Sequence, residues 1–322
     1  MSKDTGGLVI SLDFELLWGV FDKVNLEDKR AYFSNTREII AEILKQFERN
    51  DIKATWATVG MLFNSDWDEW NSNIPEEIPT YSNKKLCAYN FGNSIQNKDT
   101  ENLCFAPELI REIISTKDQE MATHTYSHYY CLENGQTISQ FGEDLKKAKE
   151  LSSKFDVNLK SLVFPRNQFN PDYLKVCTEF GLENIRTNPD NWYWKNTEKN
   201  NLIQKVFRTG DAYLGIHDKS YKSAILQSHS DGYNLQKASR FLRPHGSNMN
   251  LNKLRMKRIL SEMEKAAIGG EIYHLWWHPH NFGENSIKNI EDLEIILNHF
   301  KFLKNRHGFN SFSMDDQCTE LS

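Results

Sequence analysis

The sequence predicts an α/β fold assembled from repeated strand–helix units. Short apolar segments rich in β-branched and aromatic residues alternate with segments whose apolar residues recur at helical spacing. The alternation runs through most of the 322 residues, a length that can bury a large core in one or two domains. Repeated units of this kind favour parallel strands, closed as a barrel or open as a doubly wound sheet.

The first half of the chain shows the alternation most clearly. Residues 36–49 place Ile39, Ile40 and Ile43 on one face of a helix. Residues 107–117 form a second amphipathic helix, which opens with a proline. Strands are expected at residues 8–14, 53–60 and 120–124.

The second half continues in the same way. Strands are expected in "SLVFP", "NIRTN", "EIYHLWWH" and "FNSFSM". Further helices are expected at residues 139–155, 171–180, 251–267 and 289–304.

Two stretches break this rhythm, residues 64–106 and 189–250. Both are rich in Asn, Ser, Trp and Tyr and show weak periodicity. Long irregular segments in compact domains are usually functional or disordered, and aromatic residues are rare in disorder. The aromatics of "DWDEW" and "NWYW" therefore favour ordered loops that face a ligand, with a peripheral subdomain that only packs as the alternative. We predict a single catalytic domain over residues 1–322 with insertions at these two places.

Composition excludes several classes of partner. The net charge is -5 and no basic block is present, so nucleic acid is not an expected partner. The longest apolar runs are far too short to cross a membrane. The cysteines lack CxxC spacing and a signal-peptide pattern is absent, so we expect reduced thiols and a cytoplasmic protein. The cysteines are Cys87, Cys104, Cys131, Cys177 and Cys318.

Two carboxylates lie at the end of the first predicted strand. In "LVISLDFELLWG" the alternation of a strand puts Val9, Ser11, Asp13 and Glu15 on one face and apolar residues on the other. Sites in α/β folds are built at the carboxyl ends of strands. A single carboxylate there would most simply face solvent, but two on one face indicate a functional site.

Two histidines follow a later strand at a spacing of four. In "MATHTYSHYYC", His124 and His128 can reach one ion from the same side of a turn. Thr125 stands where the HExxH zinc proteases need glutamate, which argues against that class. With a carboxylate from Asp13 or Glu15, the pair makes a two-histidine, one-carboxylate set. Such a set suits catalytic zinc, and non-haem iron is the alternative.

Two further motifs follow predicted strands. "VFPRNQ" places Arg166 where a guanidinium can hold a carboxylate and lower its pKa, although a surface arginine is the alternative. In "YHLWWHPHNFG", His274, Trp276 and His278 share one strand face. His278 ends the strand and is the candidate general acid, with His280 as its rival. His274 lies deeper and is expected to be a hydrogen-bonded core residue.

In this order, "SLDFE", "THTYSH", "FPRNQ" and "WWHPHN" resemble the polysaccharide deacetylase superfamily, also called the NodB-homology or carbohydrate esterase family 4 superfamily. "ATWATVG" is similar to a further strand of that family, so the resemblance extends from about residue 8 to residue 314. It implies a deformed (β/α) barrel that hydrolyses N-acetyl or related amides of sugars with a divalent metal. Zinc is the metal we expect.

The resemblance also implies roles for individual residues. Many members have adjacent aspartates, whereas Phe14 follows Asp13 here and the next acid is Glu15. Some branches that act on small amides or lipid-linked sugars use such an acid–x–acid spacing, and the strand-face argument favours Glu15 over Asp13 as a ligand. The implied roles are Asp13 as general base, Glu15, His124 and His128 as metal ligands, Arg166 as the residue that orients Asp13, and His278 as general acid.

The expected reaction is metal-assisted removal of an N-acyl group, such as acetyl, from an amino sugar in surface-glycan biosynthesis. The sugar is expected to be free or carried on a nucleotide or a lipid. Three alternatives stay open: an iron-dependent oxygenase, an amidohydrolase of small ureides or cyclic imides, and a non-catalytic carbohydrate-binding relative.

Overall fold

The computed structural model describes residues 6–194, 202–214, 219–222 and 232–316. Every pairing between the named strands is parallel, as the sequence predicts. The strands are β1 (Gly7–Phe14), β2 (Ala54–Thr58), β3 (Gln119–Thr123), β4 (Ser161–Val163), β5 (Asn184–Thr187), β6 (Asn234–Lys237), β7 (Arg240–Phe241), β8 (Ile272–Trp277) and β9 (Asn310–Phe312).

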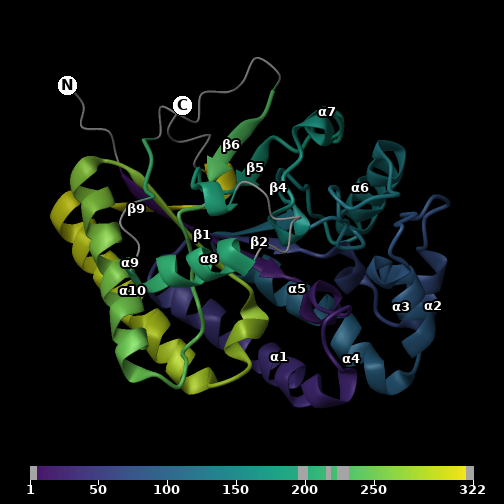
Figure 1. Ribbon diagram of the computed structural model, residues 1–322, viewed down its shortest axis with the longest axis horizontal. Coiled ribbons are helices and arrows are strands. Elements are labelled where there is room, and N and C mark those ends of the chain that lie inside the picture. Colours follow the sequence, from purple (N-terminus) through teal and green to yellow (C-terminus); the bar gives the residue numbers. More distant parts are fainter. Residues whose placement is uncertain (1–5, 195–201, 215–218, 223–231, 317–322) are drawn as a thin grey trace.

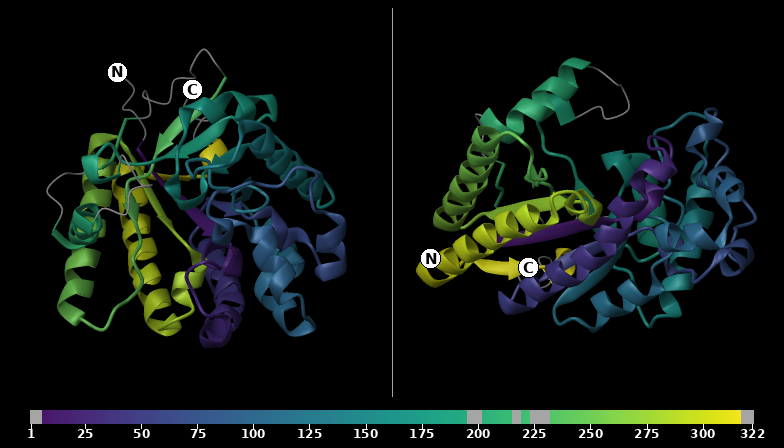
Figure 2. Two further views of the ribbon diagram at one scale, coloured as in Figure 1. Left: turned by 45° about the vertical axis from the view of Figure 1, so that its right-hand side comes forward. Right: turned by 90° about the horizontal axis from the view of Figure 1, so that it is seen from below.

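One curled sheet contains all of these strands (Figures 1 and 2). Its order is β6-β5-β4-β3-β2-β1-β8-β7, and β9 pairs with the start of β1 on the edge that faces β2, opposite β8. The edge strands β6 and β7 do not pair with each other among the described residues, so the barrel stays open. Because the strands are parallel, their carboxyl ends share one rim of the sheet.

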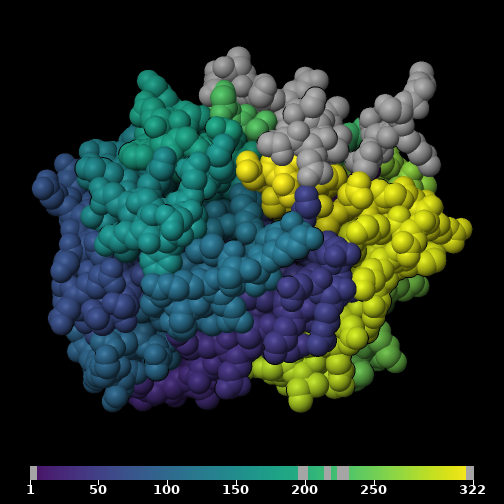
Figure 3. Space-filling model, turned by 180° about the vertical axis from the view of Figure 1, so that it is seen from behind, coloured from purple at the N-terminus to yellow at the C-terminus, as the bar shows by residue number. Residues whose placement is uncertain are grey.

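Helices cover the outside of the curl. The helices α1 and α10 pack against each other behind the sheet, as Figure 3 shows from the back. At its start α1 is capped by the side chain of Asn25, which accepts from the backbone N–H of Glu27, so it begins earlier than the predicted residue 36. The principal helices are α1 (Leu26–Arg49), α5 (Pro107–Ser115), α6 (Ile138–Ser153), α7 (Leu174–Glu179), α9 (Met249–Gly269) and α10 (Ser286–His307).

The predicted alternation of β1 is confirmed. Leu8, Ile10, Leu12 and Phe14 belong to the main core together with residues of the outer helices. Val9 belongs instead to a small apolar cluster contributed by neighbouring strands. Asp13 and Glu15 follow the parity of Val9, so they lie on the inner face at the rim of the sheet.

The insertion at residues 64–106 is part of the core and does not face a ligand. Trp67 and Trp70 of "DWDEW" are buried, and the ring of Trp70 stacks on that of Trp18 with centroids 6.3 Å apart. The expectation of ligand-facing aromatics is wrong here, because these rings supply the apolar surface that attaches the insertion to the sheet. The segment forms the short helices α2 (Trp67–Ser72), α3 (Ala88–Ile95) and α4 (Glu101–Cys104).

The second insertion, residues 189–250, contains more regular structure than predicted. It holds β6, β7 and the helix α8 (Leu202–Leu214). The tryptophans of "NWYW" are not packed into the core like those of "DWDEW". Trp192 is half exposed and Trp194 lines a cleft.

Four of the five cysteines lie in the described part of the chain, where all four are buried and none forms a disulfide. Cys318 lies outside the described residues. None of the described helices has the length and apolar character needed to cross a bilayer.

Candidate functional site

Glu15 stands among four imidazoles at the carboxyl rim of the sheet. Its Oε2 atom lies 3.0 Å from Nε2 of His128 and 3.4 Å from Nε2 of His124. Its Oε1 atom lies 3.7 Å from both Nε2 of His278 and Nδ1 of His280. Glu15 directly follows β1, the first histidine pair follows β3, and the second pair follows β8. Parallel pairing therefore brings together four of the residues predicted from sequence and the rival His280.

The loop after β3 holds its histidines with two unusual backbone conformations. Thr125 has φ 63° and His128 has φ 56°, in the left-handed region that β-branched residues in particular avoid. Asp144 of α6 supports this turn, because its carboxylate accepts the backbone N–H of Tyr126 at 2.6 Å and that of Ser127 at 3.1 Å. Such conformations persist where surrounding bonds impose them, which is common at functional sites.

His124 presents a nitrogen lone pair to Glu15. Its Nδ1 atom lies 2.8 Å from the carbonyl oxygen of Val163. A carbonyl oxygen only accepts, so Nδ1 carries the proton and Nε2 of the neutral ring has none. Two buried acceptors, Nε2 of His124 and Oε2 of Glu15, then face each other. A cation between them resolves this conflict, and a histidine that donates its other N–H to a carbonyl is typical of metal ligands.

The charge states in the cluster also suit a divalent cation. Burial lowers the pKa of His128 to about 4 against the opposing effect of Glu15. Burial acts to raise the pKa of Glu15, but the neighbouring histidines, His278 foremost, hold it well below its ordinary value. Neutral imidazole and ionised carboxylate are the forms that bind metal. Two donor sets have their atoms within 4.8 Å of one another, Glu15 with His124 and His128, and Glu15 with His278 and His280.

Gly19 leaves the space that the Glu15 carboxylate occupies. After β1 the chain turns at once into a single 3-10 turn, Leu16–Gly19, with Glu15 at its N-cap position. A β-carbon at Gly19 would overlap the carboxylate of Glu15. The glycine is therefore required for the close approach of this turn to the acid.

Arg186, and not Arg166, holds Asp13. Its NH1 and NH2 groups donate to Oδ1 and Oδ2 of Asp13, each at 2.7 Å, and both side chains are buried. Burial alone would raise the pKa of Asp13, but Arg186, together with His124 and His278, outweighs it and lowers that pKa. The predicted contact with Arg166 is wrong, because Arg166 lies in a left-handed turn after β4. There it pairs with Asp22 and lies over the ring of Tyr130.

The sequence carries a signal for Arg186 that motif reasoning missed. Within the predicted strand "NIRTN", Arg186 shares a face with Asn184 and lies opposite Ile185, so a cation stands in the middle of a buried strand. Arg186 also donates to Oγ of Ser11 at 2.9 Å, and Nε2 of His274 lies 2.8 Å from the same oxygen. His274 is thus the hydrogen-bonded core residue that was expected.

His278 is the most exposed imidazole of the group. Its side chain is 26% exposed, whereas that of His280 is 5% exposed. Its Nε2 atom lies 3.8 Å from Oδ2 of Asp13. Its Nδ1 atom lies 3.2 Å from the side-chain amide nitrogen of Asn281. An amide nitrogen donates, so the proton of the neutral ring is on Nε2, which faces both carboxylates.

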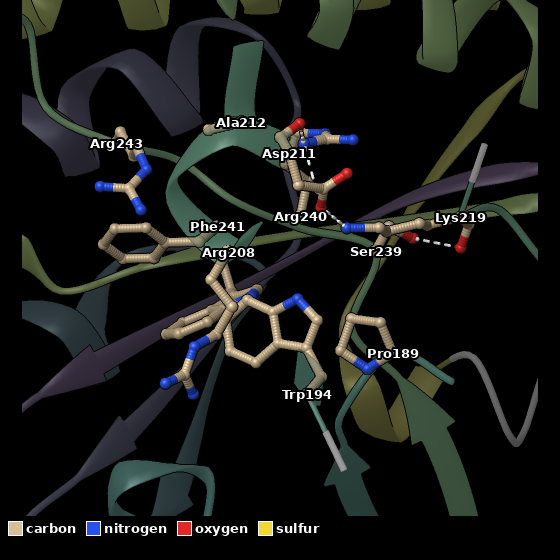
Figure 4. Close-up of a pocket in the computed structure, with 11 residues that line it drawn as sticks. Pro189, Trp194, Arg208, Asp211, Ala212, Lys219, Ser239, Arg240, Phe241 and Arg243 are labelled. Atoms are coloured by element: carbon tan, nitrogen blue, oxygen red, sulfur yellow. Dashed lines mark hydrogen bonds and ion pairs between the residues drawn. The ribbon is translucent and has the colours of Figure 1, made fainter. Parts of the chain in front are cut away.

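A cleft of about 650 Å³ lies over this cluster. Glu15, His128 and His278 line it, together with the aromatic side chains of Trp194, Phe241 and Trp276. A smaller pocket beside it shares these three aromatic residues (Figure 4). No residue of the insertion 64–106 lines the cleft.

Comparison with known protein families gives a match over about half of the chain. The family model described as polysaccharide deacetylase matches residues 18–185. No curated protein matches the sequence.

Solved structures share the fold at low sequence identity. A Mycobacterium smegmatis protein assigned as a polysaccharide deacetylase superposes with a TM-score of 0.61 and 13% identity, over 100% of this chain and 92% of that one. A GH57-type branching enzyme from Pyrococcus horikoshii gives 0.56 and 12%, over 98% and 70%. An allantoinase gives 0.54 and 11%, over 97% and 88%. These likenesses concern the fold, and they confirm the predicted deformed (β/α) barrel.

Proposed function

Because the chain belongs to the polysaccharide deacetylase family, we propose that it is a metal-dependent hydrolase that removes an N-acyl group, such as acetyl, from an amino sugar. The observation that carries the proposal is the convergence of Glu15, His124 and His128 beneath one cleft, with Asp13 and His278 beside them. Nitrogen and carboxylate donors of this kind hold zinc and leave a position free for water.

Glu15, His124 and His128 would hold the metal. When bound, a divalent ion, for which we propose zinc, supplies Lewis-acid polarisation of the amide carbonyl and lowers the pKa of a water molecule. A third buried histidine, His280, has its Nδ1 atom 3.7 Å from Oε1 of Glu15 and is a further donor at the same site.

Asp13 would accept the proton of the attacking water. The lowered pKa that Arg186 imposes keeps the carboxylate ionised at neutral pH. Two hydrogen bonds from Arg186 also prevent rotation of the Asp13 carboxylate. The carboxylate lone pairs that do not accept from Arg186 therefore keep a constant direction. His278 would protonate the departing amine from Nε2 when its ring is an imidazolium, because Nε2 faces the reacting region and an amine leaves readily only when protonated.

The walls of the cleft support a sugar as substrate. The rings of Phe241 and Trp276 lie with centroids 4.7 Å apart, and Trp194 stands beside Trp276. Flat aromatic faces next to a few polar groups are typical of sites that bind rings with one apolar side. A compact ureide would fill only a small part of 650 Å³. Four buried cysteines without a disulfide support a reducing compartment, and we place the reaction in the cytoplasm on a precursor of a surface glycan.

A substrate panel tests the proposal. N-acetyl and N-formyl amino sugars would be assayed for release of acetate or formate by chelated protein, before and after addition of zinc. We expect zinc-dependent release from at least one amino sugar by the wild type and none by His124→Ala. Allantoin-like ureides and cyclic imides form the rival panel, and turnover confined to them would assign the site to a small-molecule amidohydrolase. Sugar binding without any hydrolysis would indicate a carbohydrate-binding protein.

A further inference from the structure

The cleft over the Glu15–histidine cluster is basic, although the protein as a whole carries a net charge of -5. Among the described residues that line it, two are acidic, and one of them, Glu15, faces the histidines. The other, Glu133, accepts a hydrogen bond from Gln168 at 2.9 Å. Against these stand five basic side chains, Lys23, Arg166, Lys205, Arg208 and Arg243.

These cations come from parts of the chain that are distant in sequence. Lys23 precedes α1, Arg166 follows β4, and Arg243 follows β7. Lys205 and Arg208 project from α8, which crosses the open side of the sheet in Figure 1. A chance surface cluster on one helix would not gather side chains from four elements at one opening.

Most of these cations have no anionic partner. Arg166 pairs with Asp22. Arg243 donates to the hydroxyl of Thr209 at 3.3 Å, and Arg208 lies 5.6 Å from the ring centre of Trp194. Within the described ranges, no ion pair is formed by Lys23, Lys205, Arg208 or Arg243.

Holding these charges together is unfavourable in the free protein. Burial lowers the pKa of Lys23, and the neighbouring charge of Arg166 lowers it further, against the opposing effect of Asp22 and Glu15. Burial likewise lowers the pKa of Arg208 and of Arg243. Arg208 and Arg243 are half-buried, whereas Lys23 and Lys205 are exposed. Half-buried charges are ordinarily paired, so two uncompensated guanidinium groups are expected where an anionic ligand completes them.

The adjoining pocket shows which charges are free. In Figure 4, Arg208 and Arg243 direct their guanidinium groups to one side of the pocket, next to the aromatic rings. Asp211, the acidic residue there, turns the other way and pairs with Lys219 and Arg240. Among the described residues, Asp211 therefore forms no ion pair with Arg208 or Arg243, although its charge acts on Arg243 at longer range.

We propose that the substrate carries a phosphate or diphosphate group attached to the acylated sugar, and that this group binds to the basic residues of the cleft. The inference rests on the proposed function, since it places the amide at the Glu15–histidine cluster and the anion toward Arg208 and Arg243. Guanidinium groups pair with phosphate oxygens through two N–H donors, and lysines add point charges. A neutral glycan would leave the cations uncompensated.

Two carriers share this chemistry, a nucleoside diphosphate and a lipid diphosphate. The helix α8 offers a feature that separates them, because its outward residues are apolar. Leu202 is 74% exposed and Val206 is 62% exposed, next to the phosphate-facing Lys205. A lipid-linked substrate would contact these apolar side chains, whereas a nucleotide would not.

Kinetics on three substrates tests the proposal. These are a neutral N-acetylglucosamine oligosaccharide, UDP-N-acetylglucosamine, and N-acetylglucosamine diphosphate on a short polyprenol. We expect kcat/KM at least tenfold higher for a phosphate-bearing substrate than for the neutral one. Arg208→Gln/Arg243→Gln should lower that value about 10- to 100-fold, mainly through KM, because charge-assisted hydrogen bonds are lost. Leu202→Ser/Val206→Ser should lower turnover of the polyprenol substrate alone if lipid is the carrier.

The matched control changes the same charge at the opposite rim. Arg49 and Arg306 are exposed and lie near the ends of α1 and α10, which lead into β2 and β9. The double variant Arg49→Gln/Arg306→Gln should therefore keep wild-type kinetics on every substrate. Equal kcat/KM for neutral and phosphate-bearing sugars, or equal loss in both double variants, would overturn the proposal and leave the proposed deacylation intact.

A binding measurement separates this inference from the proposed function. Calorimetry with inorganic pyrophosphate on the full-length, zinc-loaded protein requires no turnover. All variants retain Glu15 and both ligand histidines, so binding to zinc alone would be the same in each. We expect at least tenfold weaker binding in Arg208→Gln/Arg243→Gln and in Lys23→Gln/Lys205→Gln. Unchanged binding would refute the anion site, whereas intact pyrophosphate binding without hydrolysis of any amino sugar would refute the proposed reaction.

Discussion

Arg186 and Asp13 form a buried two-point ion pair across the inside of the sheet, with both N–O distances at 2.7 Å. Arg186 is on β5 and Asp13 is on β1, and β4, β3 and β2 lie between them in the sheet order. Only a curled sheet brings these two side chains within reach. The pair therefore links the position of the carboxylate proposed as general base to the curvature of the barrel.

Arg186→Gln should destabilise the protein strongly. Removing one partner of a buried pair leaves the other charge uncompensated, which costs on the order of 3–5 kcal/mol. Urea denaturation would measure this loss, and the double variant Arg186→Gln/Asp13→Asn should lose less than the two single variants combined. Arg166→Gln is the control, because that side chain is 20% exposed and pairs elsewhere. Greater destabilisation by Arg166→Gln would contradict the assignment.

Metal content should depend on His124. The wild type is expected to retain one zinc per chain after gel filtration, as measured by elemental analysis, and His124→Ala to retain none. His307→Ala serves as the control, because it lies at the end of α10 and away from the cluster. Equal zinc in the wild type and His124→Ala would place the metal elsewhere or exclude it.

Gly19→Ala should weaken metal binding without unfolding the protein. The added methyl group overlaps the Glu15 carboxylate, so the acid must move away from the histidines. We expect the dissociation constant for zinc to rise at least tenfold, measured by competition with a chelating dye. Gly210→Ala is the matched control, since a β-carbon there meets no atom within 4 Å. Zinc affinity that is the same in both variants would show that Glu15 is not a ligand.

The two carboxylates should separate into different roles. Asp13→Asn keeps the side-chain shape but cannot accept a proton, so we expect it to bind zinc while kcat falls at least about 100-fold. Glu15→Gln should instead lose zinc. Assays would be run well below the melting temperature, because Asp13→Asn also leaves Arg186 without its partner. If Asp13→Asn loses zinc and Glu15→Gln retains it, the roles of the two residues must be exchanged.

Asp144 should make stability depend on pH. Burial raises the pKa of its carboxyl to about 6, although Ser127 and Tyr126 donate hydrogen bonds that act in the opposite direction. The folded state therefore takes up a proton near pH 6 that the unfolded chain takes up only near pH 4. The stabilisation from this proton is complete below about pH 4 and is lost as pH rises through 6, and the shift corresponds to roughly 3 kcal/mol.

Asp144→Asn tests this dependence. The variant lacks the titrating group, so its unfolding free energy relative to the wild type should change between pH 4 and 6 and stay constant above pH 7. Denaturation would be measured on chelated protein, so that release of metal does not contribute. Parallel stability curves for the two proteins over this range would show that Asp144 has an ordinary pKa.

Local patterns in the sequence were enough to predict seven of the nine named strands and the main candidate site residues, whereas β6 and β7 lie in a stretch whose periodicity was too weak. The period-two alternation of β1 placed Asp13 and Glu15 on the inner face, and the histidine spacing placed His124 and His128 together. Both inferences depend only on backbone geometry within a few residues. The rule that parallel strands share a carboxyl rim then brought His278 to the same site.

Only the tertiary structure decided which partners these side chains have. A guanidinium can pair with any carboxylate within its reach. The curvature of the sheet places Arg186 against Asp13, whereas Arg166 pairs with Asp22. Likewise, burial of the "DWDEW" rings depends on Trp18, which lies about 50 residues earlier in the chain. The basic cleft has the same origin, because charges on separate elements interact only after folding has brought those elements together.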